Sequence, residues 1–207
     1  MKPKIKILIA DDHAVVRAGL ATLLGTEPDI EVVAQAKNGE EAVKAAIATH
    51  PDVVIMDIRM PLKDGAEATA ELRDRLPAAK VLVLTSFGEA DGVAHALESG
   101  AAGAITKTAE DAELVAVVRK IASGEKYVSP EIDKLLKDSP PVPKLTPRQE
   151  EILAYMVKGL TNNEIADILR IKKDTVEEHV NLLLAKIGAA NRTEAVAIAL
   201  RKHLVEA

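Results

Sequence analysis

The first 122 residues alternate short apolar segments with helix-period segments, and this alternation limits the possible folds more than any other feature. Five apolar segments are rich in β-branched residues, as expected of strands: 4–10, 30–36, 52–56, 80–85 and 103–106. Segments with helical periodicity follow them at 13–25, 38–49, 65–75, 90–99 and 111–122. Five successive strand–helix units predict a parallel, doubly wound α/β sheet with helices on both faces.

A second, all-helical domain is predicted after a proline-rich segment. DSPPVPK, at 138–144, has three prolines in seven residues and no apolar periodicity, which is typical of a semi-extended linker. Four helices with a short joint between the first two, as in a helix-turn-helix, are predicted at 147–158, 162–169, 173–187 and 191–203. We assign 1–124 to the first domain, 125–144 to the linker and 145–207 to the helical domain. Whether 130–137 form a helix stays open.

Composition excludes several classes of function. The chain has no cysteine, which excludes disulfides and thiolate chemistry. No apolar run reaches the roughly 18 residues that a membrane-spanning helix needs, so we expect a cytoplasmic protein with no membrane partner. The net charge of −5 argues against DNA binding by bulk charge. Any DNA binding belongs to residues 144–207, which carry 10 Lys and Arg against 9 Asp and Glu.

Chemically active side chains stand at the carboxyl ends of four predicted strands. Asp11 and Asp12 follow the first strand, and Asp57 ends the third after four apolar residues. Thr85 ends the fourth strand, and the fifth runs into Lys107. Because the ligands of an open parallel sheet lie at the carboxyl ends of its strands, we expect these five side chains to converge.

Clustered carboxylates repel one another and stay ionised only if a cation joins them, and oxygen ligands of this kind suit Mg²⁺. A lysine and a hydroxyl beside the metal would face an anion, for which phosphoryl is the best fit. Asp57 would then attack as the nucleophile, while Lys107 and Thr85 bind the phosphoryl oxygens. Taken alone, an Asp at a strand end is usually a helix cap, and we interpret His13, at the start of the first helix, as structural.

The first domain resembles the receiver domain of two-component response regulators. The motifs that carry the resemblance are ADDH at 10–13, MDIRMPLKDG at 56–65, LTS at 84–86 and GAITK at 103–107. The resemblance covers the whole domain and implies a flavodoxin-like sheet with strand order 2-1-3-4-5. It also implies that the domain is no enzyme beyond its own phosphoryl transfer and dephosphorylation.

The resemblance assigns roles to the converging residues. Asp57 would accept phosphoryl from a histidine kinase, and Thr85 and Lys107 would bind the phosphoryl oxygens and transmit the signal. The implied ligands of Mg²⁺ are Asp12 and Asp57 directly, Asp11 through water, and the backbone carbonyl of Arg59.

One position departs from the receiver pattern. The family usually carries an aromatic residue three positions before the lysine, and its ring moves inward during activation; this chain has Ala104 there. The usual route of the signal is therefore absent, and Phe87, the only phenylalanine, is a candidate replacement.

The helical domain resembles the NarL/FixJ type of LuxR-like DNA-binding domain. LTPRQEEIL, GLTNNEIA, DTVEEHV and NRTEAV follow one another at the spacing of that family. The resemblance implies that the helix at 173–187 lies in the major groove of double-stranded DNA. The last helix would contribute to a homodimer that reads inverted promoter half-sites about one DNA turn apart.

Most candidate DNA contacts lie in or next to that third helix: Lys172, Lys173, Thr175, Asn181 and Lys186. By residue type, Asn181 is the best reader of a base. Glu177 stands where the family commonly has lysine. Its charge would either weaken binding to the negatively charged groove or read sequence by accepting a hydrogen bond from cytosine, and both alternatives stay open.

These observations predict a phosphorylation-dependent transcription factor in which phosphorylated Asp57 controls dimerisation and DNA binding. One alternative keeps the receiver but makes the helical domain a protein-binding module, because Glu177 and Glu178 lie on the third helix. A second alternative is a phosphatase or flavodoxin-like enzyme. Arg59 argues against it, since no second acid stands there to act on a leaving group.

Overall fold

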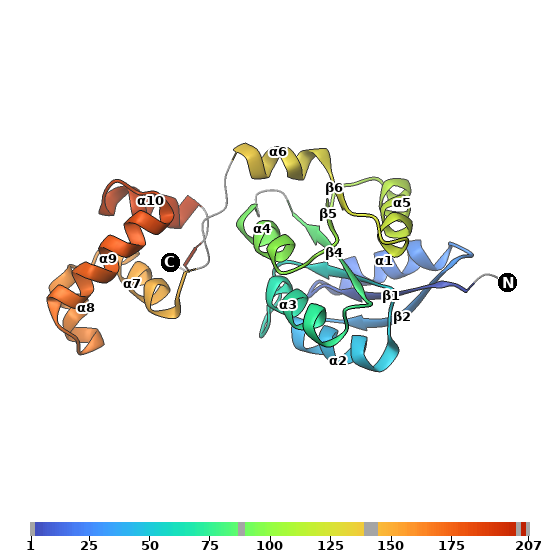
Figure 1. Cartoon of the computed structure of the whole chain (residues 1–207), viewed down its shortest axis with the longest axis horizontal. Helices are drawn as coiled ribbons and strands as arrows, with labels where there is room; N and C mark the ends of the chain where they lie inside the picture. Colours follow the sequence, from blue (N-terminus) through green and yellow to red (C-terminus); the bar gives the residue numbers. More distant parts are fainter. Residues whose placement is uncertain (1–2, 87–89, 139–144, 202–203, 206–207) are drawn as a thin grey trace. The chain divides into compact units, whose positions relative to one another are not determined.

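The chain folds into two units, Met1–Pro141 and Val142–Ala207. The computed structural model describes residues 3–86, 90–138, 145–201 and 204–205. Figure 1 labels the helices and strands of both units. Among the described residues, no helix is both long enough and apolar enough to cross a lipid bilayer.

The first unit contains a six-stranded parallel sheet. Its strands are β1 (Ile5–Ala10), β2 (Ile30–Ala36), β3 (Val53–Asp57), β4 (Lys80–Thr85), β5 (Gly103–Thr106) and β6 (Tyr127–Val128). They lie in the order β2-β1-β3-β4-β5-β6, and every neighbouring pair is parallel. The predicted order of the first five strands, and with it the doubly wound α/β fold, is confirmed.

Alternating side chains of the strands form two apolar cores, one on each face of the sheet. Ile7 and Ile9 of β1 belong to the core that also contains Leu114. Leu8 belongs to the opposite core, together with Leu72. Accordingly, one face is covered by α1 (Ala14–Gly25) and α5 (Asp111–Ala122), and the other by α2 (Gly39–Thr49), α3 (Gly65–Arg75) and α4 (Ala90–Glu98).

Two of these helices begin one residue later than the sequence pattern predicts. The residues at the expected starts, His13 and Asn38, have extended backbone conformations and are N-caps. The Asn38 side chain accepts a hydrogen bond from the backbone N–H of Glu41, which satisfies one of the free donors of the first helical turn.

Part of the range assigned to the linker, 125–144, is structured instead, so the five-strand prediction is one strand short. Tyr127 and Val128 form β6 beside β5, and α6 (Pro130–Asp138) follows. Ile132 of α6 is 1% exposed and packs in the same core as Val93 of α4. A nine-residue helix is short by itself, and its stability depends on this burial. Residues 139–144, most of the proline-rich segment, lie outside the described residues.

Ala104 occupies the position of the missing aromatic residue and is fully buried. It pairs with Val83 of β4 and Val128 of β6, and its carbonyl accepts a hydrogen bond from the N–H of Ser129 at 3.0 Å. Ala104 and Ile132 belong to the same core. β6 and the start of α6 are therefore packed next to Ala104, the position at which the receiver pattern has an aromatic residue. Phe87, the candidate replacement, lies outside the described residues.

The second unit contains four helices over its described residues: α7 (Pro147–Val157), α8 (Asn162–Leu169), α9 (Lys173–Ile187) and α10 (Arg192–Arg201). Thr146 and Thr161 start α7 and α8 with reciprocal capping hydrogen bonds to Gln149 and Glu164. Gly188 ends α9 at a φ of 71°, a conformation that glycine adopts without strain. The predicted four-helix domain is confirmed, and 202–203 of its last predicted helix lie outside the described residues.

We predict that Ile132→Ala destabilises the first unit by roughly 2–5 kcal/mol, because it removes a fully buried side chain and leaves a cavity. Lys134→Ala, on the exposed side of the same helix, is the matched control and should change stability by less than about 0.5 kcal/mol. Urea unfolding measures both effects, and hydrogen exchange of β5 amides assigns the transition to this unit. Equal effects of the two substitutions would show that α6 is not part of the core.

Candidate functional site

Lys107 connects two buried carboxylates at the carboxyl edge of the sheet. Asp11 directly follows β1, Asp57 ends β3, and Lys107 directly follows β5. The Lys107 Nζ atom lies 2.6 Å from Asp11 Oδ2 and 3.0 Å from Asp57 Oδ2. The two carboxylate side chains are only 1% and 4% exposed. Three strands of the sheet, β1, β3 and β5, thus place one ammonium group between two acids, with β4 lying between β3 and β5.

The two acids beside Lys107 stabilise the charged form of its ammonium group. Burial opposes the charged ammonium, but the hydrogen bonds and charges of Asp11 and Asp57 outweigh this effect, so the pKa of Lys107 is raised above its usual value. The backbone is fixed as well, because the N–H of Lys107 donates to the carbonyl of Thr85 at 2.7 Å. A cation with defined backbone placement therefore faces the Asp57 carboxylate.

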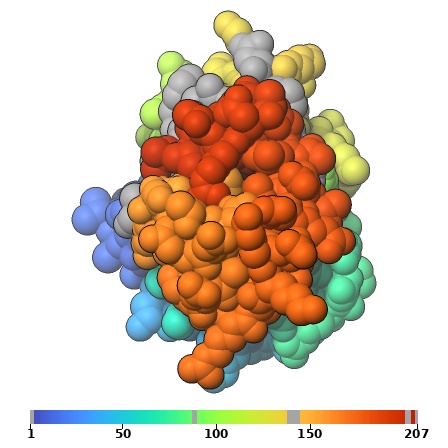
Figure 2. All heavy atoms as spheres, turned by 90° about the vertical axis from the view of Figure 1, so that its left-hand side faces the viewer, coloured from blue at the N-terminus to red at the C-terminus, as the bar shows by residue number. Residues whose placement is uncertain are grey.

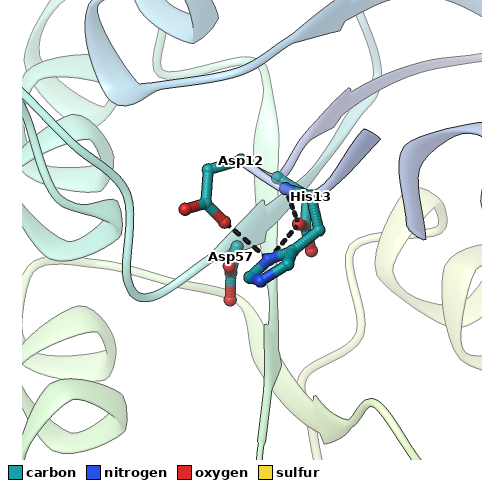
Figure 3. A group of neighbouring side chains, drawn as sticks. Asp12, His13 and Asp57 are labelled. Carbon is teal, nitrogen blue, oxygen red and sulfur yellow. Dashed lines mark hydrogen bonds and ion pairs between the residues drawn. The ribbon is translucent and has the colours of Figure 1, made fainter. Parts of the chain in front are cut away.

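Asp12 and His13 complete the cluster on its more exposed side. One ligand atom from each of Asp11, Asp12, His13 and Asp57 lies within 4.8 Å of the others. The His13 Nδ1 atom is 2.7 Å from Asp12 Oδ1 and 3.3 Å from Asp11 Oδ1. Figure 3 shows the imidazole ring lying beside Asp57, with the Asp12 carboxylate on the same side of the ring. The expected convergence of the three acids is present in the structure, and a histidine accompanies them.

The turn after β3 holds the Asp57 carboxylate in place. The N–H of Ile58 donates to Asp57 Oδ1 at 2.9 Å, and the N–H of Gly65 donates to the carbonyl of Ile58 at 2.9 Å. A Cβ atom at Gly65 would lie 2.1 Å from the Asp57 carbonyl oxygen, far closer than van der Waals contact. Only glycine at 65 lets the start of α3 return this close to the end of β3.

Thr85 and Arg59 occupy different positions relative to the cluster. Thr85 ends β4, next to β3, is 1% exposed, and its hydroxyl donates to the carbonyl of Ser86 at 3.1 Å. Arg59 lies in the turn two residues after Asp57 and is exposed. The roles assigned to these two residues from the sequence stay predictions.

His13 lies in the candidate cluster, although the sequence predicts a structural role for it. Its side chain makes no capping hydrogen bond at the start of α1. Its ring is instead directed to the acids. The sequence feature that indicates this placement is the position of His13 directly after Asp11 and Asp12 at the end of a strand, which puts it at the same sheet edge.

The candidate DNA contacts lie along α9 of the second unit. Lys172 is the N-cap of α9 and is exposed, and Lys173, Thr175, Glu177 and Asn181 follow within its first three turns. Lys173 Nζ and Glu177 Oε1 are 3.4 Å apart, so these two candidates form an ion pair. In the space-filling view of Figure 2, the orange and red atoms of this unit form a continuous rounded surface.

Lys186 has a different environment from the other candidates. Its Nζ atom donates to Gln149 Oε1 of α7 at 3.2 Å. Gln149 is buried and also closes the capping box at the start of α7. The Lys186 ammonium is therefore engaged within the helical unit itself.

Comparison with known proteins places both units in characterised families. Residues 7–119 match the response regulator receiver domain, and residues 143–199 match the bacterial regulatory proteins of the luxR family. The response regulator protein VraR of Staphylococcus aureus is 39% identical over 207 residues, covering 98% of this chain and 99% of the relative. VraR of Staphylococcus epidermidis has the same identity and coverage.

Solved structures agree with this relationship. The response regulator ChrA of a heme-sensing two-component system is 35% identical, with a TM-score of 0.59 over 98% of this chain and 99% of that one. An RcsB–DNA complex has a TM-score of 0.66 at 21% identity, over 96% of this chain and 98% of that one, and shows likeness of fold alone. Both resemblances inferred from the sequence are thereby confirmed. The chain belongs to the two-component response regulators, with a receiver domain followed by a luxR-family regulatory domain.

Proposed function

We propose that this response regulator accepts a phosphoryl group on Asp57 and thereby controls transcription. The observation that carries the proposal is the position of the Asp57 carboxylate, which ends β3 3.0 Å from the Lys107 ammonium and within a cluster of further acids. A carboxylate oxygen of Asp57 would form a bond to phosphorus, while the bond from phosphorus to the kinase histidine breaks. The kinase imidazole leaves with the electron pair of that bond.

Each pocket residue has a task in this reaction. Lys107 would neutralise charge on the transferred group, moving from a carboxylate to a phosphoryl oxygen within its reach. Thr85 would donate its hydroxyl to a second phosphoryl oxygen. The two groups belong to adjacent strands, and the bond from the Lys107 N–H to the Thr85 carbonyl fixes their spacing. Preorganised donors of this kind cost little reorganisation when charge moves.

The donor set fits Mg²⁺. Asp11, Asp12 and Asp57 each bring a carboxylate oxygen to within 4.8 Å of the others, and hard cations prefer oxygen ligands of this type. We propose that Asp12 and Asp57 hold the ion directly, Asp11 through water, and Arg59 through its backbone carbonyl. When bound, the ion offsets the repulsion between the acids and the incoming phosphoryl group.

Phosphorylation would shift the receiver between two conformations because it changes the charge at Asp57. The added phosphoryl group carries about −1.5 to −2 charges. It would compete with Asp11 for the ammonium of Lys107, which bridges Asp11 and Asp57 in the structure described here. A ligand shifts an equilibrium only through such a difference in interaction between its states. Homodimer formation is the proposed response.

The second unit would bind double-stranded DNA through α9. Lys172, Thr175 and Asn181 lie on or next to this helix, and the RcsB complex shows the same overall fold with DNA. A homodimer would present two copies of α9 to inverted promoter half-sites. The ion pair of Lys173 with Glu177 offsets the acidic charge that argues against binding in the major groove.

The same ion pair also supports an alternative function. If Lys173 is engaged by Glu177, α9 carries less free positive charge, and its exposed face would suit a protein partner. A partner protein would make no contacts with nucleic-acid phosphates, so its binding would lack the steep dependence on salt that counterion release gives to DNA binding.

We predict that Asp57→Asn abolishes covalent phosphorylation by acetyl phosphate with Mg²⁺, because an amide is not a competent nucleophile. Asp64→Asn is the matched control. Asp64 caps α3 by accepting a hydrogen bond from Glu67, and asparagine caps equally well. Intact-protein mass spectrometry measures the phosphoryl adduct. An adduct on the Asp57 variant equal to that on wild type would place the acceptor elsewhere.

The logarithm of DNA affinity falls linearly with the logarithm of salt concentration. We predict that Lys172→Ala makes this negative slope shallower by about 0.9, because one phosphate contact is lost. Lys186→Ala should leave this slope unchanged, since the Lys186 ammonium is bonded to Gln149. Fluorescence anisotropy with a promoter fragment selected by the phosphorylated protein, at several salt concentrations, measures both slopes. Failure to select any fragment at low salt, with the protein dimeric and folded, would favour the protein-binding alternative.

A further inference from the structure

His13 faces the acidic pocket from its open side. Its side chain is 68% exposed and that of Asp12 is 35% exposed, while Asp11 is almost fully buried. The backbone N–H of His13 donates to Asp11 Oδ1 at 2.8 Å, which fixes the start of α1 next to the acid. The ring therefore lies on the solvent-exposed side of the acid cluster, and Figure 3 shows it beside Asp57.

The separations around the His13 ring match those between neighbouring ligands of one metal ion. Two ligands that each lie about 2.1 Å from an octahedral ion, at right angles, are about 3.0 Å apart. His13 Nδ1 lies 2.7 Å from one Asp12 oxygen and 3.3 Å from one Asp11 oxygen. One ligand atom of Asp57 also lies within 4.8 Å of these atoms.

We propose that His13 is an additional ligand of the pocket cation. Its imidazole would make the site selective for transition-metal ions that bind nitrogen ligands over Mg²⁺. The inference rests on the proposed function, because it assumes that the acids hold a cation. Imidazole suits ions such as Ni²⁺ and Zn²⁺, whereas Mg²⁺ keeps oxygen ligands and water. The same pocket would thus bind Mg²⁺ through its carboxylates and bind Ni²⁺ more tightly through carboxylates and His13.

The local chemistry favours a ligand role over a capping role. Histidine is not among the residues favoured at an N-cap, and His13 makes no capping hydrogen bond, so the start of α1 does not require an imidazole. Of the two carboxylates beside the ring, Asp11 is also bound by Lys107 through its other oxygen. The acid left most available to share an ion with His13 is Asp12, which is more exposed.

The test compares Ni²⁺ and Mg²⁺ affinities of the full-length protein by isothermal titration calorimetry. His13→Asn should weaken Ni²⁺ at least about ten-fold, the lower end of what loss of even an outer-shell partner costs, and should change Mg²⁺ affinity less than about two-fold. Asparagine is favoured at an N-cap, so the variant should fold. His50→Asn is the matched control: His50 has a left-handed backbone conformation that asparagine tolerates, and it belongs to a different segment.

Two further measurements tie the effect to this pocket. Excess Mg²⁺ should displace Ni²⁺ competitively from wild type, and Ni K-edge absorption should show imidazole scattering that is lost in His13→Asn and kept in His50→Asn. Equal weakening of both metals by His13→Asn, or no weakening of either, overturns the role of His13. Asp57→Asn separates the two proposals, because an unchanged Mg²⁺ affinity in that variant would overturn the cation site itself and with it the proposed function.

Discussion

The double ion pair of Lys107 with Asp11 and Asp57 is the interaction on which the rest of the pocket depends. Buried carboxylates are costly without a counter-charge, and removing one partner of a buried pair leaves an uncompensated charge. Here a single ammonium group serves two acids from two different strands. Any group that binds at Asp57 must therefore change what Lys107 contacts, which couples chemistry at β3 to the position of β5 and its neighbours.

That coupling leads toward α6 in this chain. Lys107 and Ala104 both belong to the segment around β5, and Ala104 contributes a carbonyl that binds Ser129 at the start of α6. An aromatic side chain that moves between two positions needs space. Here Ala104 is fully buried in the same apolar cluster as Ile132, so this core leaves no such space. Because close-packed interiors transmit small displacements, a shift of β5 would reach α6, the last described element before the second unit.

In this receiver the apolar strands determine where the clustered acids lie. Strands buried on both faces fix the positions of their last residues, because each side chain next to the pocket is preceded by residues locked in one of the two cores. The tight return at Gly65 then holds the backbone around Asp57. The sheet thus brings the charged groups close enough for Lys107 to pair with both Asp11 and Asp57.

Local patterns in the sequence determined the elements, because apolar periodicity reports which faces are buried, and parallel strands place Asp11, Asp57 and Lys107 at one edge. Tertiary structure alone decided the rest. β6 was not predicted and a helix at 130–137 stayed open, because both depend on the surface that β5 and α4 offer to Val128 and Ile132. Tertiary structure also decided the contacts of His13 with the acids and of Lys186 with Gln149. A long side chain can reach several partners, and only the folded chain determines which of them lie nearby.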